Sequence, residues 1–162
     1  MSSRGLVWIA LAMGAWIALA GAWLAPAGTA LAQGVCRITT VPLAFGTYLP
    51  GNTAAHDVTG EVEVSCRGRQ ASFQIAISPG TSGSFTTRLM VSASHQLLYN
   101  LYRDPAHTLI WGDGTGGTAL NSGDMSRNGR EDFVLPIYGR IPPQQSVGAG
   151  LYSDEVIITV YF

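Results

Sequence analysis

The chain contains no lysine, so arginine supplies all 9 basic side chains against 10 acidic ones in 162 residues. The arginines are scattered, and the densest pair, Arg67 and Arg69, only flanks a glycine. A nucleic-acid-binding protein needs a positive stripe that neutralises phosphates, and the sequence contains none. We therefore expect no nucleic-acid partner.

Residue spacings that are typical of an active site are also missing. No Gly-x-Ser-x-Gly elbow is present that would expose a nucleophilic serine to a histidine. Adjacent carboxylates occur at 131–132 and 154–155, and on a strand such neighbours point to opposite faces. They cannot form an acid–base couple, so we expect that the chain is not an enzyme.

Signatures of metals and cofactors are absent as well. His56, His95 and His107 are far apart, and no carboxylate accompanies them at ligand spacing, which favours surface positions, although a sandwich could gather them. The glycine-rich residues 112–118 lack the Gly-Lys-Ser/Thr ending of a phosphate cradle and the glutamate that closes a calcium loop. We expect a flexible turn there, and no cofactor or metal.

Residues 1–32 are typical of a secretory signal peptide. A basic start at Arg4 precedes an apolar stretch over residues 5–25, and Ala30-Leu31-Ala32 fits a cleavage site. An uncleaved membrane anchor is the alternative, because a bilayer-spanning helix needs about 20 apolar residues. We expect export, cleavage after Ala32 and no permanent membrane span. The mature domain would then cover residues 33–162, which is the usual size of one domain.

Two other small-residue sites would allow cleavage after Ala20 or Ala27 instead. The choice sets the length of the mature N-terminus. Cleavage after Ala20 would leave residues 21–35, a segment of about 50 Å when fully extended. That segment has few large apolar side chains and would make a poor alternating strand.

Cysteine occurs only at Cys36 and Cys66, without the Cys-x-x-Cys spacing of a zinc or redox motif. An exported chain folds in an oxidising compartment, where two cysteines form one disulfide by default. The bond would close a loop of about 30 residues and stabilise the fold by roughly 3 kcal/mol.

Helical periodicity of useful length is missing after the signal, and short runs of period two take its place. In residues 60–66, for example, Val62, Val64 and Cys66 share one face. The expected extended segments are 37–41, 44–49, 60–66, 72–78, 88–91, 97–102, 109–111, 133–138 and 151–162, with a loop over 112–130. This pattern predicts an all-β, immunoglobulin-like antiparallel β-sandwich. Pro136 predicts a sheet edge or a bulge, because proline cannot donate to the ladder.

The last expected strand is apolar to its end. One face carries Val156, Ile158, Val160 and Phe162, and the other carries Ile157, Thr159 and Tyr161. Such a strand must be buried in its own sheet or against another protein. Aromatic residues are also more numerous than core packing requires, so that some must face outward: Tyr99, Tyr102, Trp111, Tyr138, Tyr152 and Tyr161.

Several blocks in order resemble the spore coat protein U domain family. They are Cys36-Arg-Ile38, Ala44-Phe-Gly-Thr-Tyr48, Gly60–Cys66, Phe73–Ser78, Leu97–Asp104, Pro136–Pro142 and Gly150–Phe162. Each block is weak alone, but together they cover nearly all of residues 36–162. The resemblance implies a subunit of archaic chaperone–usher pili or a related secreted coat protein.

In such pilins the sandwich lacks one strand, which leaves an apolar groove. A periplasmic chaperone lends a strand before export through an outer-membrane usher, and a neighbouring subunit's N-terminal extension then replaces it. By this resemblance, Val156, Ile158, Val160 and Phe162 border the groove and contact the partner. Their alternative role is that of core residues in a complete sheet.

The N-terminus departs from the polymerising members of this family. After cleavage at Ala32, only residues 33–35 precede Cys36, which is too short to span a neighbour's groove. We therefore expect a subunit that accepts a strand without giving one, as suits a tip or terminal position on the cell surface. The alternative function is that of a secreted adhesin or carbohydrate-binding module, which would use residues 112–130.

Overall fold

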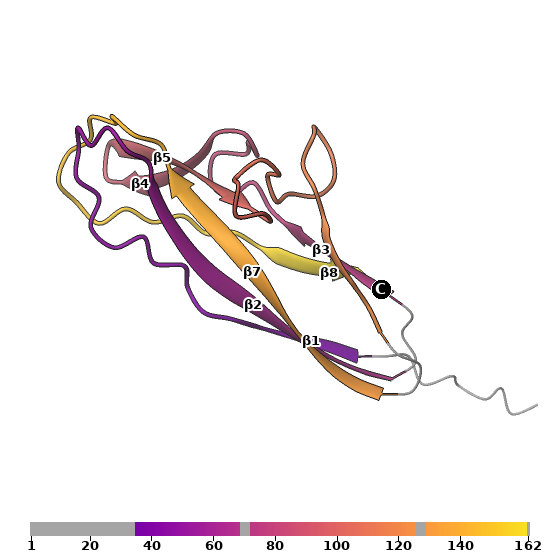
Figure 1. Cartoon of the computed structure of the whole chain (residues 1–162). Coiled ribbons are helices and arrows are strands. Elements are labelled where there is room, and N and C mark those ends of the chain that lie inside the picture. Colours follow the sequence, from indigo (N-terminus) through magenta and orange to yellow (C-terminus); the bar gives the residue numbers. More distant parts are fainter. Residues whose placement is uncertain (1–34, 69–71, 126–128, 162) are drawn as a thin grey trace, which may run out of the picture. The chain divides into compact units, whose positions relative to one another are not determined.

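The computed structural model describes residues 35–68, 72–125 and 129–161, which form two antiparallel β-sheets (Figure 1). The larger sheet has the strand order β1–β2–β7–β5–β4, and the smaller sheet has the order β6–β3–β8. The strands are β1 (Val35–Thr40), β2 (His56–Gly68), β3 (Ser72–Ile77), β4 (Arg88–Ser92), β5 (His95–Tyr102), β6 (Asn121–Asp124), β7 (Gly129–Ile141) and β8 (Ile158–Tyr161). This architecture confirms the predicted immunoglobulin-like sandwich.

The described residues all belong to one compact unit, Leu31–Phe162. They contain no helix, and so none of them forms a helix that could cross a membrane. The predicted signal peptide, residues 1–32, lies outside the described residues.

Alternation along the strands builds the core between the sheets. Val62 and Val64 of β2 are buried, whereas Glu61 and Glu63 on its other face are exposed. Phe73, Ile75 and Ile77 of β3 are buried from the opposite side. Fully buried side chains of both sheets join one hydrophobic cluster, and removing this apolar surface from water drives the folding.

A buried arginine crosses this core. Arg88 of β4 has no exposed surface, and its Nη1 donates to Asn100 Oδ1 at 2.7 Å. Its Nη2 donates to the carbonyl oxygens of Ser78 at 3.0 Å and Trp111 at 2.9 Å. These bonds satisfy most of the hydrogen-bond donors of the guanidinium group. Burial of this charged group without such partners would cost a large amount of free energy. They also fix the loops after β3 and β5 relative to β4.

The C-terminal segment passes from one sheet to the other. Ser153 exchanges both backbone hydrogen bonds with Val91 of β4, at 2.9 and 3.1 Å. Four residues later, the Ile157 carbonyl accepts the Ser78 amide at 2.8 Å, and the Ile157 amide donates to Ser78 Oγ. Only then does β8 pair with β3. The prediction of one strand over 151–162 was therefore too long, because the partner of this backbone changes from β4 to the β3 side along it.

Two other expected strands are not regular strands. Residues 44–49 have no strand pairing, and Leu43, Phe45 and Tyr48 pack instead onto the core from a loop. Residues 109–111 make isolated bridges, Tyr102 with Ile110 and Trp111 with Ala119. Residues 44–49 thus find no strand partner among the described residues, and residues 109–111 contact β5 through too few bridges to form a regular strand.

The predicted loop over 112–130 was wrong in part, because it contains β6 and the start of β7. β6 reads Asn-Ser-Gly-Asp and carries no apolar alternation. Its strand geometry comes from antiparallel pairing with β3, from Ser72 opposite Asp124 to Ile75 opposite Asn121.

Pro136 lies within β7, opposite Glu61 of β2. Although β7 is an inner strand of the sheet, its pairing with β5 covers only Tyr138 to Arg140. Pro136 therefore lies at a local edge, as predicted. The β2–β7 register runs one-to-one past it, so there is no bulge.

Candidate functional site

The smaller sheet has one apolar edge strand, β8. Within the described residues, β8 pairs with β3 alone, so the backbone groups on its other side have no strand partner. The opposite edge of the same sheet, β6, is short and polar, which discourages another chain from pairing with it. The two edges of the smaller sheet therefore differ in composition, because β8 is largely apolar and β6 is polar.

Side chains that face the core from β8 are only half-buried. Ile158 lies opposite Ile77, and Val160 lies opposite Ile75, in the register of β8 with β3. Both isoleucines of β3 are fully buried, whereas Ile158 and Val160 keep part of their surface in contact with solvent. Val156, just before the strand, is half-buried in the same way. Phe162 lies outside the described residues.

The edge strand of the larger sheet, β1, has the same incomplete cover. Cys36 and Ile38 face the core and are half-buried, while their partners in β2, Cys66 and Val64, have no exposed surface. Core-facing side chains are thus half-buried on the edge strands β1 and β8, and also at Phe133 and Leu135 of β7, where β7 has no pairing with β5. An immunoglobulin-like sandwich with one strand too few would have this distribution of exposure.

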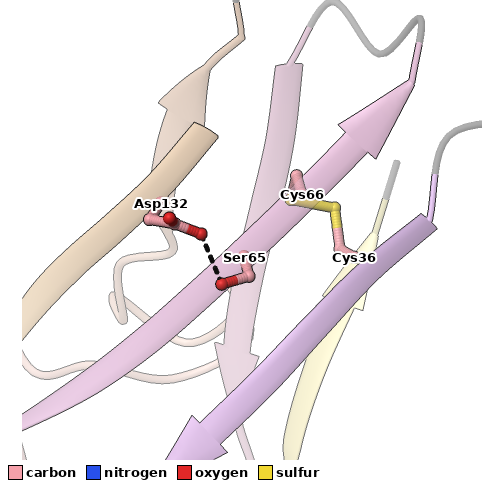
Figure 2. Close-up of a disulfide and its surroundings, with 4 residues drawn as sticks. All are labelled: Cys36, Ser65, Cys66 and Asp132. Carbon is pink, nitrogen blue, oxygen red and sulfur yellow. Dashed lines mark hydrogen bonds between the residues drawn. A yellow bond between two sulfur atoms is a disulfide. The ribbon is translucent and has the colours of Figure 1, made fainter. Parts of the chain in front are cut away.

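The expected disulfide between Cys36 and Cys66 is present and fastens β1 to β2 (Figure 2). The two residues are direct partners in the antiparallel register, with Cα atoms 4.0 Å apart. Next to it, the Ser65 hydroxyl donates to Asp132 Oδ1 at 2.5 Å and links β2 to β7. This bond lowers the pKa of Asp132. A covalent bond and a charge-assisted one therefore hold the register at this end of the larger sheet.

Asp154 holds the segment that leads into β8. Its Oδ2 accepts the Tyr99 hydroxyl at 2.7 Å, and its Oδ1 accepts the amides of Thr81 and Glu155, both at 2.9 Å. Partial burial opposes ionisation, but these hydrogen bonds outweigh it and lower the pKa of Asp154. Burial and the bond to Asp154 raise the pKa of Tyr99. Gly80, at φ +75°, leaves room for this carboxylate.

The outer face of β8 is also apolar. Ile157 and Tyr161 are 65% and 54% exposed, with the exposed Thr159 between them. Tyr161 borders a shallow hollow with Ser72, Phe73 and Gln74, and none of these side chains is charged. β8 therefore presents apolar groups on both faces. The sequence showed this pattern, but it did not show which face would remain in water.

The three histidines do not form a metal site. Within the described ranges, no three His, Cys, Asp or Glu side chains lie close enough to hold a metal ion. His56 contacts the Phe45 carbonyl at 2.5 Å, and His95 is exposed at the start of β5. The prediction of a surface position was wrong for His107, whose side chain is 7% exposed. His107 lies in the loop after β5, and its ring packs onto Tyr102 and Tyr138.

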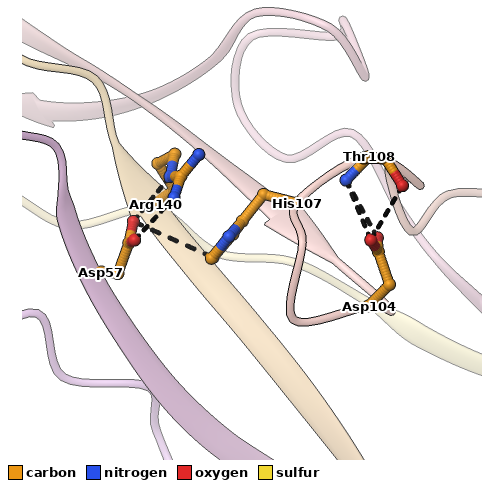
Figure 3. A network of polar contacts seen from close by, with 5 residues as sticks. All are labelled: Asp57, Asp104, His107, Thr108 and Arg140. Carbon is orange, nitrogen blue, oxygen red and sulfur yellow. Dashed lines mark hydrogen bonds and ion pairs between the residues drawn. The ribbon is translucent and has the colours of Figure 1, made fainter.

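His107 packs edge-on against Tyr102 and Tyr138, with ring centroids 5.1 and 6.2 Å away. Its Nε2 lies 3.8 Å from Asp57 Oδ1 (Figure 3). Both oxygens of Asp57 also accept hydrogen bonds from Arg140, at 2.6 Å each, and these lower the pKa of Asp57. The cluster ties β2, β5 and β7 together on the outside of the sheet, which is a structural role.

The glycine-rich turn uses its polar groups on itself. Asp113 Oδ1 accepts the amide and hydroxyl of Thr115 at 2.9 and 2.6 Å, and Thr118 Oγ1 accepts the Gly114 amide at 3.1 Å. Residues 113–117 are exposed. Trp111, just before the turn, is fully buried and donates from Nε1 to the Ile75 carbonyl at 3.0 Å.

A family model for the Spore Coat Protein U domain matches residues 24–159 of the chain. The chain belongs to this family. The resemblance seen in the sequence blocks is thereby confirmed. A search of curated proteins with the sequence of this chain found no match.

The solved structures that are similar to this Spore Coat Protein U domain include two pilus proteins. One is a chain of the CsuC–CsuE chaperone–tip adhesion subunit pre-assembly complex from the archaic chaperone–usher Csu pili of Acinetobacter baumannii, with a TM-score of 0.56 and 20% identity. The alignment covers 80% of this chain and 40% of that chain, so this chain spans less than half of its relative's length. The other is the minor tip subunit HdaB of the E. coli Hda pilus, with a TM-score of 0.39, 12% identity and coverage of 78% and 79%. The first likeness shows that the fold is shared.

Proposed function

We propose that this chain is a non-enzymatic structural subunit of a cell-surface pilus, and that it accepts a strand from another protein along β8. The observation that carries the proposal is the unpaired edge of β8 beside a half-covered core. An added strand would bond to the β8 backbone and cover Val156, Ile158 and Val160. Phe162 extends the same face in the sequence.

Family membership and fold support the identity of the partners. The Csu complex, which shares the fold, is described as a chaperone bound to a pilus subunit before assembly. We propose the same sequence of partners for this chain: a periplasmic chaperone first, an outer-membrane usher next, and a neighbouring pilus subunit in the finished fibre. Covering an apolar edge in the periplasm prevents the aggregation that such an edge invites.

The start of β1 supports a terminal position in the fibre. β1 begins at Val35, so a chain cleaved after Ala32 has only Gln33 and Gly34 ahead of its first strand. Two residues are too few to pair with the edge strand of a neighbouring subunit. The subunit would therefore accept a strand and give none. N-terminal sequencing of the exported protein tests this position, and a mature start at Gly21 would refute it.

Hydrogen–deuterium exchange tests the strand addition itself. Amides of β8 should exchange at least about 100-fold more slowly in surface-assembled protein than in the isolated exported subunit, because an added strand protects them. Amides of β6, the polar edge of the same sheet, provide the internal control and should not change. Equal exchange of β8 in the two states would refute the proposal.

A matched pair of variants gives a second test. Val160→Asp places a charge under the proposed added strand, whereas Thr159→Asp places the same charge on the exposed face of β8. We expect that Val160→Asp abolishes surface assembly and that Thr159→Asp retains it. Assembly by both variants would contradict a role for the inward face.

The adhesin alternative rests on the exposed turn at residues 113–117. It predicts that substitutions in this turn abolish attachment to a surface without changing the stability of the domain. Attachment that survives replacement of the whole turn by a Gly-Ser linker would exclude it.

A further inference from the structure

The outer face of the larger sheet brings three arginines together. Arg67 of β2 lies directly opposite Arg130 of β7, and Arg37 of β1 lies opposite Ser65, two residues from Arg67. All three arginines are exposed. Like charges directly opposite each other destabilise a sheet, so this arrangement is unfavourable in the isolated chain.

Local carboxylates compensate for only part of this charge. Asp132 Oδ2 lies 3.5 Å from Arg130 Nε, and its other oxygen already accepts the Ser65 hydroxyl. Arg37 and Arg67 form no ion pair with another described residue within 4.0 Å. Two guanidinium groups at this corner are therefore available to an external carboxylate.

Further along the same face the charge changes sign. Glu61 and Glu63 of β2 are exposed, and their partners in β7 are Pro136 and Val134. Val134 is 59% exposed and lies at the level of Glu63, between the levels of Glu61 and Arg67 along the strands. Arg67 and Glu61 are six residues apart on one strand, which is about 20 Å at the usual rise of about 3.3 Å. We refer to Arg37, Glu61, Glu63, Arg67, Arg130 and Val134 as the charged face.

We infer that the charged face binds the charged face of a second copy of this chain. A two-fold axis across the strands reverses their direction, so it places the arginine end of one copy over the Glu61–Glu63 end of the other. Each contact then occurs twice, as a self-complementary interface requires. Val134 of each copy lies near the axis, where apolar surface is removed from water.

Charge complementarity favours a second copy over other partners. A polyanion would be attracted to the arginine end and repelled by Glu61 and Glu63 within about 20 Å on the same strand. The face needs a partner that carries both signs in reverse order, and the face itself provides this. The inference goes beyond the proposed function, because it uses the outside of the larger sheet and leaves the β8 edge free. It would join subunits side by side.

Exposed ion pairs are individually weak and are screened by salt. We therefore expect a weak, salt-sensitive association of the exported chain, measured by sedimentation equilibrium. Dimers seen at about 50 mM NaCl should be lost at about 1 M, where the screening length is about 3 Å. A chain that is monomeric at low salt, or a dimer that is insensitive to salt, would overturn the inference.

Charge reversal tests the geometry. Arg67→Glu with Arg130→Glu should weaken self-association at least about tenfold, and so should Glu61→Arg with Glu63→Arg. An equimolar mixture of the two variants should regain the wild-type association, because each supplies the charges that the other has lost. A mixture no stronger than either variant alone would overturn the inference.

The matched control reverses two exposed carboxylates outside the face, Asp124 of β6 and Glu155 before β8. Asp124→Arg with Glu155→Arg changes the net charge as much as the Glu61 and Glu63 reversal does, and it should leave association unchanged. An equal loss in this control would attribute the effect to net charge and overturn the inference. All reversed side chains are exposed, and unchanged urea midpoints verify that the variants are folded.

Discussion

Replacement of Asp154 by asparagine should destabilise the domain at neutral pH and not in acid. The carboxylate accepts three hydrogen bonds, from the Tyr99 hydroxyl and from the amides of Thr81 and Glu155. A hydrogen bond to a charged group contributes about 1.5–3 kcal/mol. Because Asp154 is half-exposed and asparagine keeps one acceptor oxygen, we expect a total loss of about 1–2 kcal/mol at pH 7.

The pH dependence follows from the lowered pKa of Asp154, which its hydrogen bonds produce against the effect of partial burial. In the unfolded chain the carboxyl titrates near about 3.9. The stabilisation is fully present above that value and is lost as the pH falls through the lower pKa of the folded state. The difference between wild type and Asp154→Asn should therefore shrink as the pH falls below about 3.9 and vanish below the lowered pKa of the folded state.

Urea denaturation of the exported chain at several pH values measures this difference as a shift in midpoint at constant slope. Glu155→Gln is the control, because that neighbouring side chain is exposed, and it should shift stability by less than about 0.5 kcal/mol. Tyr99→Phe should add little further loss of stability to Asp154→Asn, since both changes affect the same hydrogen bond between Tyr99 and Asp154. An equal loss at pH 7 and at pH 3, or full additivity with Tyr99→Phe, would refute the reasoning.

Three other changes test the framework of the fold. Joint replacement of Cys36 and Cys66 by serine should lower the free energy of unfolding by roughly 3 kcal/mol, and a urea midpoint equal to that of the oxidised protein would contradict the role of the bond. Trp111→Phe removes a buried hydrogen bond and leaves a void, so we expect a loss of about 2–3 kcal/mol, seen as a lower Tm. Gly80→Ala should cost more than about 1 kcal/mol, because φ is +75° and the added Cβ would overlap Asp154. A neutral result in calorimetry would show that the turn adjusts.

The inner strands could be predicted from the sequence because their side chains alternate between core and solvent. Val62 and Val64 in β2, and Ile75 in β3, follow period two and are buried as expected. β6 could not be predicted, because its four residues are polar and adopt a strand only by pairing with β3. The loop at 44–49 shows the reverse case, in which an alternating segment finds no strand partner.

Of the features of the candidate site, too, some could be predicted from the sequence and others could not. Period two put Ile158 and Val160 on one face of the last strand, and only the structure shows that this face lies towards the core. Whether a partner covers them stays a prediction. The cluster of Arg67 and Arg130 could not be foreseen, since residues so far apart in sequence meet only through the β2–β7 register. Patterns within one segment reveal which face is apolar, and only the pairing of strands reveals which charges become neighbours.

The disulfide has a mechanical consequence. Cys36 is the second residue of β1, so tension applied ahead of Val35 passes through the sulfur atoms to Cys66 instead of peeling β1 from its neighbour. From there the load enters β2, and all 13 residues of β2 have partners in β7. Tension along a strand strains these bonds together in shear, and they resist far better than bonds that are opened one after another. The sheet would thereby resist, as one unit, any pull applied to the start of β1.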